Sequence, residues 1–256
     1  MGKVVVDSIK VSNHNRQIDG LVYMPMESGI YPVVIFSHGY NGFKTDFDST
    51  ARFLAERGIC AVTFAFCGGS TRDTSGMSTK DMTIFTEKDD LFAVISYVKE
   101  LEFINEKQVF LFGGSQGGLV TALVVEDIPD EIRGMILLYP AFCIADDWNK
   151  KFPEKEDIPE EFELWDMKLG RVFFESIYGY DVFEHVGKYE NPILVMHGEK
   201  DAIVSMSYMD KIKKAYKNVH LELFPLEGHG FSDEGTKKMT ELLYDFVVRN
   251  CIEDKK

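Results

Sequence analysis

Short, nearly continuous runs of apolar residues recur along most of the chain. Five of these runs contain almost no polar positions: residues 33–36, 60–64, 109–112, 135–138 and 193–196. A strand that is buried on both faces has this pattern, because neither face meets water, and such strands form parallel sheets covered by helices on each side. The runs therefore predict a central parallel sheet.

Three further runs complete the predicted sheet. Residues 3–11 and 18–24 alternate apolar with polar positions and are separated by the polar residues 12–15, a pattern typical of an antiparallel hairpin. Residues 219–224 form a last run near the end of the chain. The sequence thus predicts about eight strands, of which the first two are antiparallel.

Apolar residues between the strands recur at helical spacing. One helix has Leu91, Val94 and Val98 on one face, and we expect Thr86 to cap its N-terminus. Residues 47–57, 119–126, 206–216 and 239–248 have the same periodicity. Alternating strands and helices of this length predict a doubly wound α/β sheet, whose ligands bind at the carboxyl ends of the strands.

One interval interrupts this alternation. About fifty residues separate the strand ending near residue 139 from the one starting near residue 193, more than a crossover needs. The interval is rich in charge, and its residues 142–183 include both tryptophans and eight other aromatic residues. We interpret residues 142–189 as a small helical cap inserted into a core domain made of residues 1–141 and 190–256. These residues are called the insert below.

The charge balance excludes several classes of partner. The chain has 28 Lys and Arg against 42 Asp and Glu, a net charge of −14. Such a chain repels phosphate backbones, and it has no basic cluster that would bind an anionic membrane. No apolar run approaches the roughly 18–20 residues of a membrane helix, and the first residues lack the apolar segment of a signal peptide. We expect a cytoplasmic protein that binds neither nucleic acid nor membrane.

The cysteines and histidines indicate no metal site. Cys60, Cys67, Cys143 and Cys251 include no Cys-x-x-Cys pair, and no His-x-x-His pattern occurs. Buried thiols that behave as small apolar side chains explain the four cysteines. No cofactor is predicted, and the sequence leaves the oligomeric state open, a homodimer included.

A nucleophile motif follows one of the predicted strands. Residues 113–117 read Gly-Gly-Ser-Gln-Gly, directly after the run 109–112 and before a predicted helix. This is the context of a nucleophile elbow, in which glycines on both sides of Ser115 allow a tight turn. A second Gly-Gly-Ser at residues 68–70 has Arg72 in place of the second glycine and is interpreted as an ordinary turn.

A serine needs a base, and the base needs an orienting acid. His229 lies between two glycines after the last strand, whereas the other histidines lie in the hairpin turn, in the insert, inside a strand or before a strand-end glycine. Asp201 follows the strand 193–196 and is the predicted acid, with Glu199 as its competitor and Asp146 and Asp147 as more distant candidates.

The predicted reaction also needs two N–H donors for an oxyanion. The residue after the nucleophile, Gln116, supplies one at a helix N-terminus. The loop after the first buried strand, residues 37–42, is expected to supply the other from Tyr40, because Gly39 allows a sharp turn there. The alternative is that this loop is only a tight turn.

From residue 1 to about 250 the chain resembles α/β-hydrolases, most of all the small bacterial cinnamoyl (feruloyl) esterases and related carboxylesterases. The shared features are the loop at Tyr40, the elbow at Ser115, the Tyr-Pro-Ala of residues 139–141, the insert, and the loops of Asp201 and His229. Residues 66–72 depart from the family, which usually has an Asp and a Gly-x-Gly run there.

This resemblance implies the α/β-hydrolase fold, with serine, acid and histidine in that chain order. It also implies that polar groups of the insert contact a phenolic hydroxyl and that its aromatic residues contact the ring. Asp147 lies where such a polar group is found, and Trp148, Trp165 and Tyr178 are the aromatic candidates.

The predicted function is that of a serine hydrolase. Ser115, Asp201 and His229 would cleave a small carboxylic ester of a hydroxycinnamic or similar aryl acid through an acyl-enzyme. The alternatives are an esterase, lipase or thioesterase for aliphatic acyl groups and, in a different class, a non-catalytic ligand-binding protein of the same fold. A peptidase is disfavoured, because the chain has no additional domain to select peptides.

Overall fold

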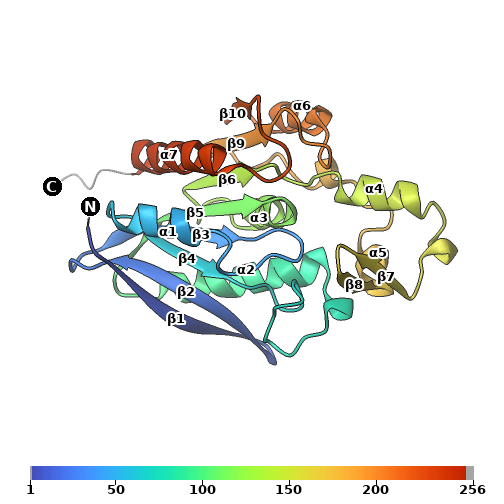
Figure 1. The fold of residues 1–256 in the computed structure, drawn as a ribbon, viewed down its shortest axis with the longest axis horizontal. Coiled ribbons are helices and arrows are strands. Elements are labelled where there is room, and N and C mark those ends of the chain that lie inside the picture. Colours follow the sequence, from blue (N-terminus) through green and yellow to red (C-terminus); the bar gives the residue numbers. More distant parts are fainter. Residues whose placement is uncertain (1, 252–256) are drawn as a thin grey trace.

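The computed structural model describes residues 2–251, which form one eight-stranded sheet covered by helices on both faces (Figure 1). Its strands, in chain order, are β1 (Val4–Asn13), β2 (Arg16–Pro25), β3 (Tyr31–Ser37), β4 (Cys60–Phe64), β5 (Ile104–Gly114), β6 (Gly134–Leu138), β9 (Ile193–Gly198) and β10 (Val219–Phe224). Their spatial order is β1-β2-β4-β3-β5-β6-β9-β10.

In this spatial order, the strands β4, β3, β5, β6, β9 and β10 are parallel to one another. Strand β2 pairs with β4 in the antiparallel direction. The β1–β2 hairpin pairs Val4 with Pro25 through to Asn13 with Arg16, as its alternating pattern predicts. Eight strands and an N-terminal hairpin confirm the predicted fold class.

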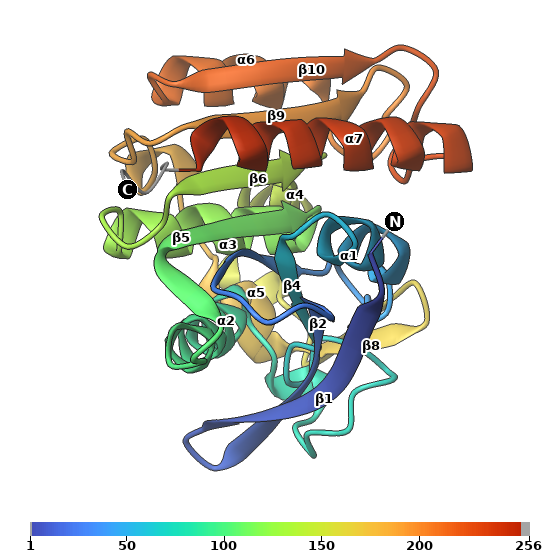
Figure 2. The same cartoon turned by 90° about the vertical axis from the view of Figure 1, so that its left-hand side faces the viewer.

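Two layers of helices enclose the sheet (Figure 2). Helices α1 (Asp48–Ala55) and α7 (Asp233–Asn250) pack on one face, and α2 (Ile84–Lys99), α3 (Gln116–Asp127) and α6 (Met206–Ala215) pack on the other. The buried strands point their side chains alternately into these two layers, which is why their sequences are apolar throughout.

The N-terminus of α2 differs from the prediction. Thr83, and not Thr86, is the capping residue: its hydroxyl accepts from the Thr86 amide (3.0 Å), and the Thr86 hydroxyl accepts from the Thr83 amide (2.9 Å). This reciprocal capping box starts the helix one turn earlier. Glu87 lies in the first turn of this helix, on its buried side.

The insert lies beyond the carboxyl ends of the strands, at the opposite end of the molecule from the two termini (Figure 1). It contains α4 (Ile144–Lys151) and α5 (Arg171–Ser176), but also an antiparallel pair, β7 (Glu161–Leu164) and β8 (Met167–Gly170). The prediction of a purely helical cap is therefore wrong.

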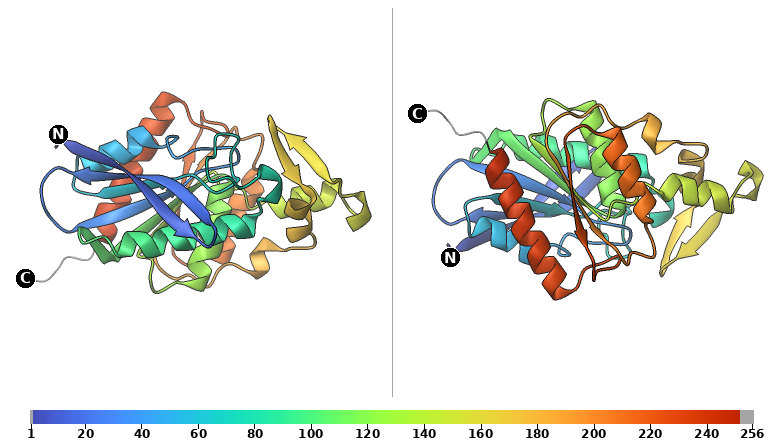
Figure 3. Two further views of the ribbon diagram at one scale, coloured as in Figure 1. Left: turned by 90° about the horizontal axis from the view of Figure 1, so that it is seen from below. Right: turned by 90° about the horizontal axis from the view of Figure 1, so that it is seen from above.

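The hairpin has a local cause. The β7 sequence Glu-Phe-Glu-Leu alternates with period two, and Trp165 and Asp166 both have positive φ values (47° and 60°), as a two-residue hairpin turn requires. Figure 3 shows this hairpin at the outer end of the molecule in two further views. None of the helices described between residues 2 and 251 is long and apolar enough to cross a membrane.

Candidate active site

Ser115 lies in the turn between β5 and α3, in a backbone conformation that a non-glycine residue rarely adopts (φ 51°, ψ −119°). Its amide donates to the carbonyl of Leu138 in β6 (2.9 Å), and its carbonyl accepts from the Ala141 amide (3.0 Å). These bonds to the neighbouring strand end hold the strained turn in place.

The glycines on either side of Ser115 are required sterically. A Cβ atom on Gly113 would lie 2.3 Å from the Gly117 carbonyl oxygen, and one on Gly117 would lie 2.3 Å from the His38 carbonyl oxygen. Both distances are far below van der Waals contact, and the atoms met are backbone atoms. The elbow therefore brings the start of α3 directly against the end of β3.

The structure brings together the three residues predicted for catalysis, although they lie on loops far apart in the chain. His229 Nε2 is 2.9 Å from Ser115 Oγ, and His229 Nδ1 is 2.8 Å from Asp201 Oδ2. The Asp201 side chain is fully buried, whereas 14% of the His229 side chain is exposed. The serine, imidazole and carboxylate thus form one continuous hydrogen-bonded chain that ends at a solvent-accessible cavity.

Asp201 is held as a carboxylate. The amides of Ile203 and Val204 donate to its Oδ1 (2.8 and 2.9 Å). Burial raises the pKa of Asp201, but the hydrogen bonds from His229 and from these amides outweigh it, so the pKa lies below its usual value. An ionised Asp201 keeps the Nδ1 proton of His229 in place and leaves Nε2 to accept from Ser115.

The competing candidates lie elsewhere. Glu199 is exposed, and Asp146 accepts from the Tyr208 hydroxyl (2.5 Å) on the surface. His38 and His197 are buried, and each is hydrogen-bonded to backbone atoms. Within the described residues, His229 is the histidine whose ring contacts the Ser115 hydroxyl.

The loop after β3 passes directly beside the elbow, since a Cβ atom on Gly39 would lie 3.1 Å from the Ser115 Cβ. His38 orients this loop. Its Nε2 accepts from the Phe66 amide (3.0 Å), so Nδ1 carries the proton and donates to the Gly39 carbonyl (2.7 Å). Because the carbonyl of Gly39 and the N–H of Tyr40 belong to one trans peptide, fixing the first also fixes the direction of the second.

Burial lowers the pKa of His38, so its imidazole stays neutral and keeps this pattern of donor and acceptor. The second predicted donor, the N–H of Gln116, is the first of α3 and has no acceptor inside the helix. Both predicted N–H groups therefore belong to segments that border Ser115.

A buried carboxyl group that the sequence pattern did not predict holds the Gln116 side chain in place. The Gln116 Nε2 donates to Glu87 Oε2 (2.8 Å), and both side chains are buried. Burial raises the pKa of Glu87 to about 8, although the bond from Gln116 acts in the opposite direction. Glu87 thus keeps its proton at neutral pH and anchors the side chain next to the nucleophile.

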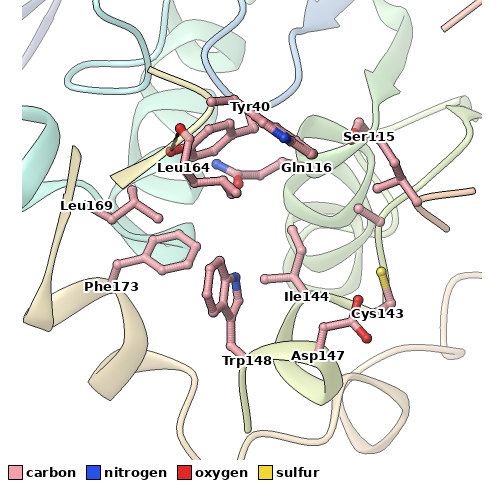
Figure 4. A pocket seen from close by; sticks show the side chains of 13 residues that line it. Tyr40, Ser115, Gln116, Cys143, Ile144, Asp147, Trp148, Leu164, Leu169 and Phe173 are labelled. Carbon is pink, nitrogen blue, oxygen red and sulfur yellow. Dashed lines mark hydrogen bonds between the residues drawn. The ribbon is translucent and has the colours of Figure 1, made fainter. Parts of the chain in front are cut away.

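A cavity of about 150 Å³ extends from Ser115 under the insert (Figure 4). Tyr40 and Gln116 lie on one side of it, and Trp148 and Asp147 lie on the opposite side. Most of the remaining lining is apolar: Ala141, Cys143, Ile144, Leu164, Trp165, Leu169, Phe173 and Ile203. A cavity of about this volume can hold a benzene ring.

Among the described residues that line this cavity, Asp147 alone is charged. Burial raises the pKa of the Cys143 thiol, and the nearby Asp147 carboxylate raises it further, so the thiol stays protonated and donates to Asp147. The carboxylate thus provides a hydrogen-bond acceptor at the end of the cavity that lies away from Tyr40.

Three of the four residues predicted to contact substrate line the cavity: Asp147, Trp148 and Trp165. Tyr178 does not. Its hydroxyl donates to the Pro153 carbonyl (2.9 Å) within the insert, and the side chain is 38% exposed. Tyr178 is not among the residues that line the cavity, so the structure gives no support to its predicted contact with substrate.

The cavity also contains residues that the sequence analysis did not select. Phe173 is one of many aromatic residues in the insert, and the sequence does not distinguish it from the others. Leu164 and Leu169 line the cavity from the paired strands β7 and β8. The period-two alternation of β7 was the signal available for these two. Nothing in the sequence marked Ile203, whose position follows from the Asp201 turn.

The side chains of the 38–41 loop hold the turn of the β7–β8 hairpin. The Tyr40 hydroxyl donates to the carbonyls of Leu164 (3.0 Å) and Met167 (3.2 Å), and the Asn41 side chain donates to the carbonyl of Trp165 (3.3 Å). Three successive contacts thus link the elbow region to the insert. They stabilise a turn in which a bulky tryptophan has a positive φ.

Tyr40→Phe is expected to lower the free energy of unfolding by about 1–2 kcal/mol and to lower kcat/KM, because it removes these bonds and leaves the backbone N–H in place. Tyr178→Phe is the matched control, since its hydroxyl also bonds a carbonyl of the insert but lies away from the cavity. Denaturant unfolding and ester hydrolysis measure both variants. Equal kinetic losses in the two variants would contradict the role of Tyr40.

Comparison with known proteins agrees with this geometry. The model of the prolyl oligopeptidase family matches residues 45–253. Human serine hydrolase BPHL is 24% identical over 94% of this chain and 87% of its own, and human monoacylglycerol lipase ABHD6 is 22% identical over 89% and 79%. Est1E of Butyrivibrio proteoclasticus, solved with bound ferulic acid, matches with a TM-score of 0.86 and 26% identity over 94% of this chain and 98% of that one. The chain is thus a serine hydrolase of the α/β-hydrolase type and belongs to the prolyl oligopeptidase family.

Proposed function

We propose that the protein is an esterase that hydrolyses esters of hydroxycinnamic or similar aryl acids through an acyl-enzyme on Ser115. The observation that carries the proposal is the position of the Ser115–His229–Asp201 triad beside a cavity lined mainly by apolar and aromatic side chains, with the Asp147 carboxylate on the side opposite Tyr40. A planar aryl acid bearing a hydroxyl group complements both the shape and the polarity of this cavity.

In the proposed mechanism, His229 transfers a proton twice in each half-reaction, first as a base and then as an acid. His229 accepts the proton of Ser115 as the hydroxyl attacks the ester carbonyl, and Asp201 stabilises the resulting imidazolium. The N–H groups of Tyr40 and Gln116 donate to the developing oxyanion. His229 then protonates the departing alcohol, and water repeats the sequence on the acyl-enzyme.

Asp147 has a defined part in this proposal. Its carboxylate would accept a hydrogen bond from the phenolic hydroxyl of the acyl group, while Trp148 and Phe173 contact the ring. A methyl ether at the same position cannot donate. A preference for an acyl group with a free phenolic hydroxyl over its methyl ether therefore distinguishes this proposal from a general esterase activity.

An aliphatic acyl group is the second candidate, because ABHD6 is named as a monoacylglycerol lipase and the cavity lining is mostly apolar. Cleavage of an acyl amide is the third, in view of the family to which the chain belongs. Both would use the same serine chemistry with a different acyl group or leaving group.

A panel of ethyl ferulate, ethyl 3,4-dimethoxycinnamate, ethyl octanoate and a peptide p-nitroanilide tests the three candidates. We expect kcat/KM for ethyl ferulate to exceed that for the dimethoxy ester by about tenfold, and Asp147→Ala to remove this difference. Asp146→Ala, one residue along and facing the surface, is the control and should retain it. A higher kcat/KM for the octanoate or the anilide would favour the corresponding alternative and contradict the aryl assignment.

A further inference from the structure

A second cavity, of about 270 Å³, opens on the other side of Ser115. It shares Tyr40, Ser115 and Trp165 with the first cavity, the one that extends under the insert. Its remaining walls include Asp46, Tyr139 and His229, none of which lines the first cavity. The nucleophile therefore stands between two spaces of different chemistry.

The position of His229 decides which half of an ester enters which space. In the proposed mechanism this imidazole protonates the departing oxygen, so the alcohol must leave on the side of the serine where His229 lies. His229 lines the second cavity. The alcohol half of the ester accordingly occupies the second cavity, and the acyl half occupies the first.

Asp46 gives the second cavity a strong hydrogen-bond acceptor. Its Oδ2 accepts from the Phe43 amide (2.8 Å), which fixes the carboxylate, and its Oδ1 lies 3.5 Å from the Arg72 guanidinium. Both partners of this ion pair are partly exposed, so the pair is weak. A carboxylate has about four acceptor sites, and these contacts leave some of them open to a ligand.

Tyr139 adds a second polar group. It follows β6 directly with a positive φ of 37°, and its ring contacts that of His229 at a centroid distance of 4.6 Å. Its hydroxyl has no hydrogen-bond partner within residues 2–251. Burial raises the pKa of Tyr139 to about 12, and the charges of Asp201 and Asp46 act in the same direction, so the hydroxyl keeps its proton.

We infer that this second cavity binds the alcohol half of the ester and selects alcohols that carry a further hydroxyl group, which donates to Asp46 and accepts from Tyr139. This inference rests on the proposed esterase function and adds the substrate class of the leaving group.

Three esters of the acid that the wild-type protein hydrolyses best test the inference: the methyl, propyl and 2-hydroxyethyl esters. The last two are similar in size, and only the hydroxyethyl group can donate a hydrogen bond. We expect kcat/KM for the hydroxyethyl ester to exceed that for the propyl ester by about tenfold in the wild type. Asp46→Ala and Asp46→Asn should each reduce this ratio to near one.

The Asn variant keeps the fold of the loop, because its carboxamide oxygen can still accept from the Phe43 amide. Asp48→Asn is the matched control: this neighbouring carboxylate bonds Tyr23 and Arg52 outside the cavity, and its loss should leave the ratio unchanged. Tyr139→Phe should reduce the ratio in part.

The rate with the methyl ester reports the proposed function, and the ratio reports the inference. Hydrolysis of the methyl ester with equal rates for the other two esters would overturn the inference alone. So would a ratio that survives both Asp46 variants, or one that Asp48→Asn reduces equally. Absence of hydrolysis of all three esters would overturn both.

Discussion

Replacing Ser115 by alanine is expected to lower kcat for ester hydrolysis by about 10⁴- to 10⁶-fold while the fold is retained. The loss is large because the Ser115 hydroxyl, which His229 Nε2 contacts directly, forms the covalent intermediate of the proposed mechanism. Stability should change little, since alanine has the same Cβ atom in the strained turn (φ 51°). Steady-state kinetics and denaturant unfolding of the purified variant measure the two effects.

Ser70→Ala provides a matched control within the same chain. Ser70 also ends a Gly-Gly-Ser sequence after a strand, but its hydroxyl bonds the Asn41 side chain (3.2 Å). Its loss should change kcat by less than about tenfold. A fluorophosphonate should label the wild type and Ser70→Ala but not Ser115→Ala. Labelling of the Ser115 variant, or near wild-type turnover by it, would show that another nucleophile acts.

The second large effect concerns Glu87 and the dependence of stability on pH. Its pKa in the folded protein is raised to about 8, whereas an unfolded chain gives glutamate its ordinary value near 4.5. Below pH 4.5 the carboxyl is protonated in both states. As the pH rises from about 4.5 to 8, only the unfolded chain loses this proton, so the folded protein loses stability on the order of 5 kcal/mol.

Glu87→Gln removes this titration, because a carboxamide does not ionise and can still accept from Gln116. We expect the variant to be close to the wild type at pH 5 and more stable than it at pH 8.5, as measured by chemical denaturation at both values. Glu100→Gln, an exposed position just after the same helix, should show no such divergence. A constant difference between Glu87→Gln and the wild type across this range would contradict the burial argument.

Most of the sheet could be predicted because two-sided burial leaves a direct record in the sequence. Residues 60–64 and 109–112, for example, are apolar at every position but one, and the structure buries them. The β7–β8 hairpin escaped prediction because its strands are four residues long and its turn residues, Trp165 and Asp166, differ from the usual Asn-Gly. Short alternation in a highly charged segment is a weak signal.

The residues of the candidate site, too, could be predicted only in part. Ser115, Asp201 and His229 could be selected because each follows a predicted strand, and parallel strands end at one edge of the sheet. Glu87 and Asp46 could not be selected in this way, because their proximity to the elbow depends on how α2 and residues 38–46 pack. Tyr178 was chosen for its residue type alone, and the path of the chain after α5 places its hydroxyl on Pro153.

The bonds from Tyr40 and Asn41 tie the loop beside Ser115 to the turn of the β7–β8 hairpin. A displacement of this turn would therefore disturb the loop that carries the Tyr40 N–H as well as the wall of the cavity. Substitutions that loosen the turn should accordingly change kcat as well as KM.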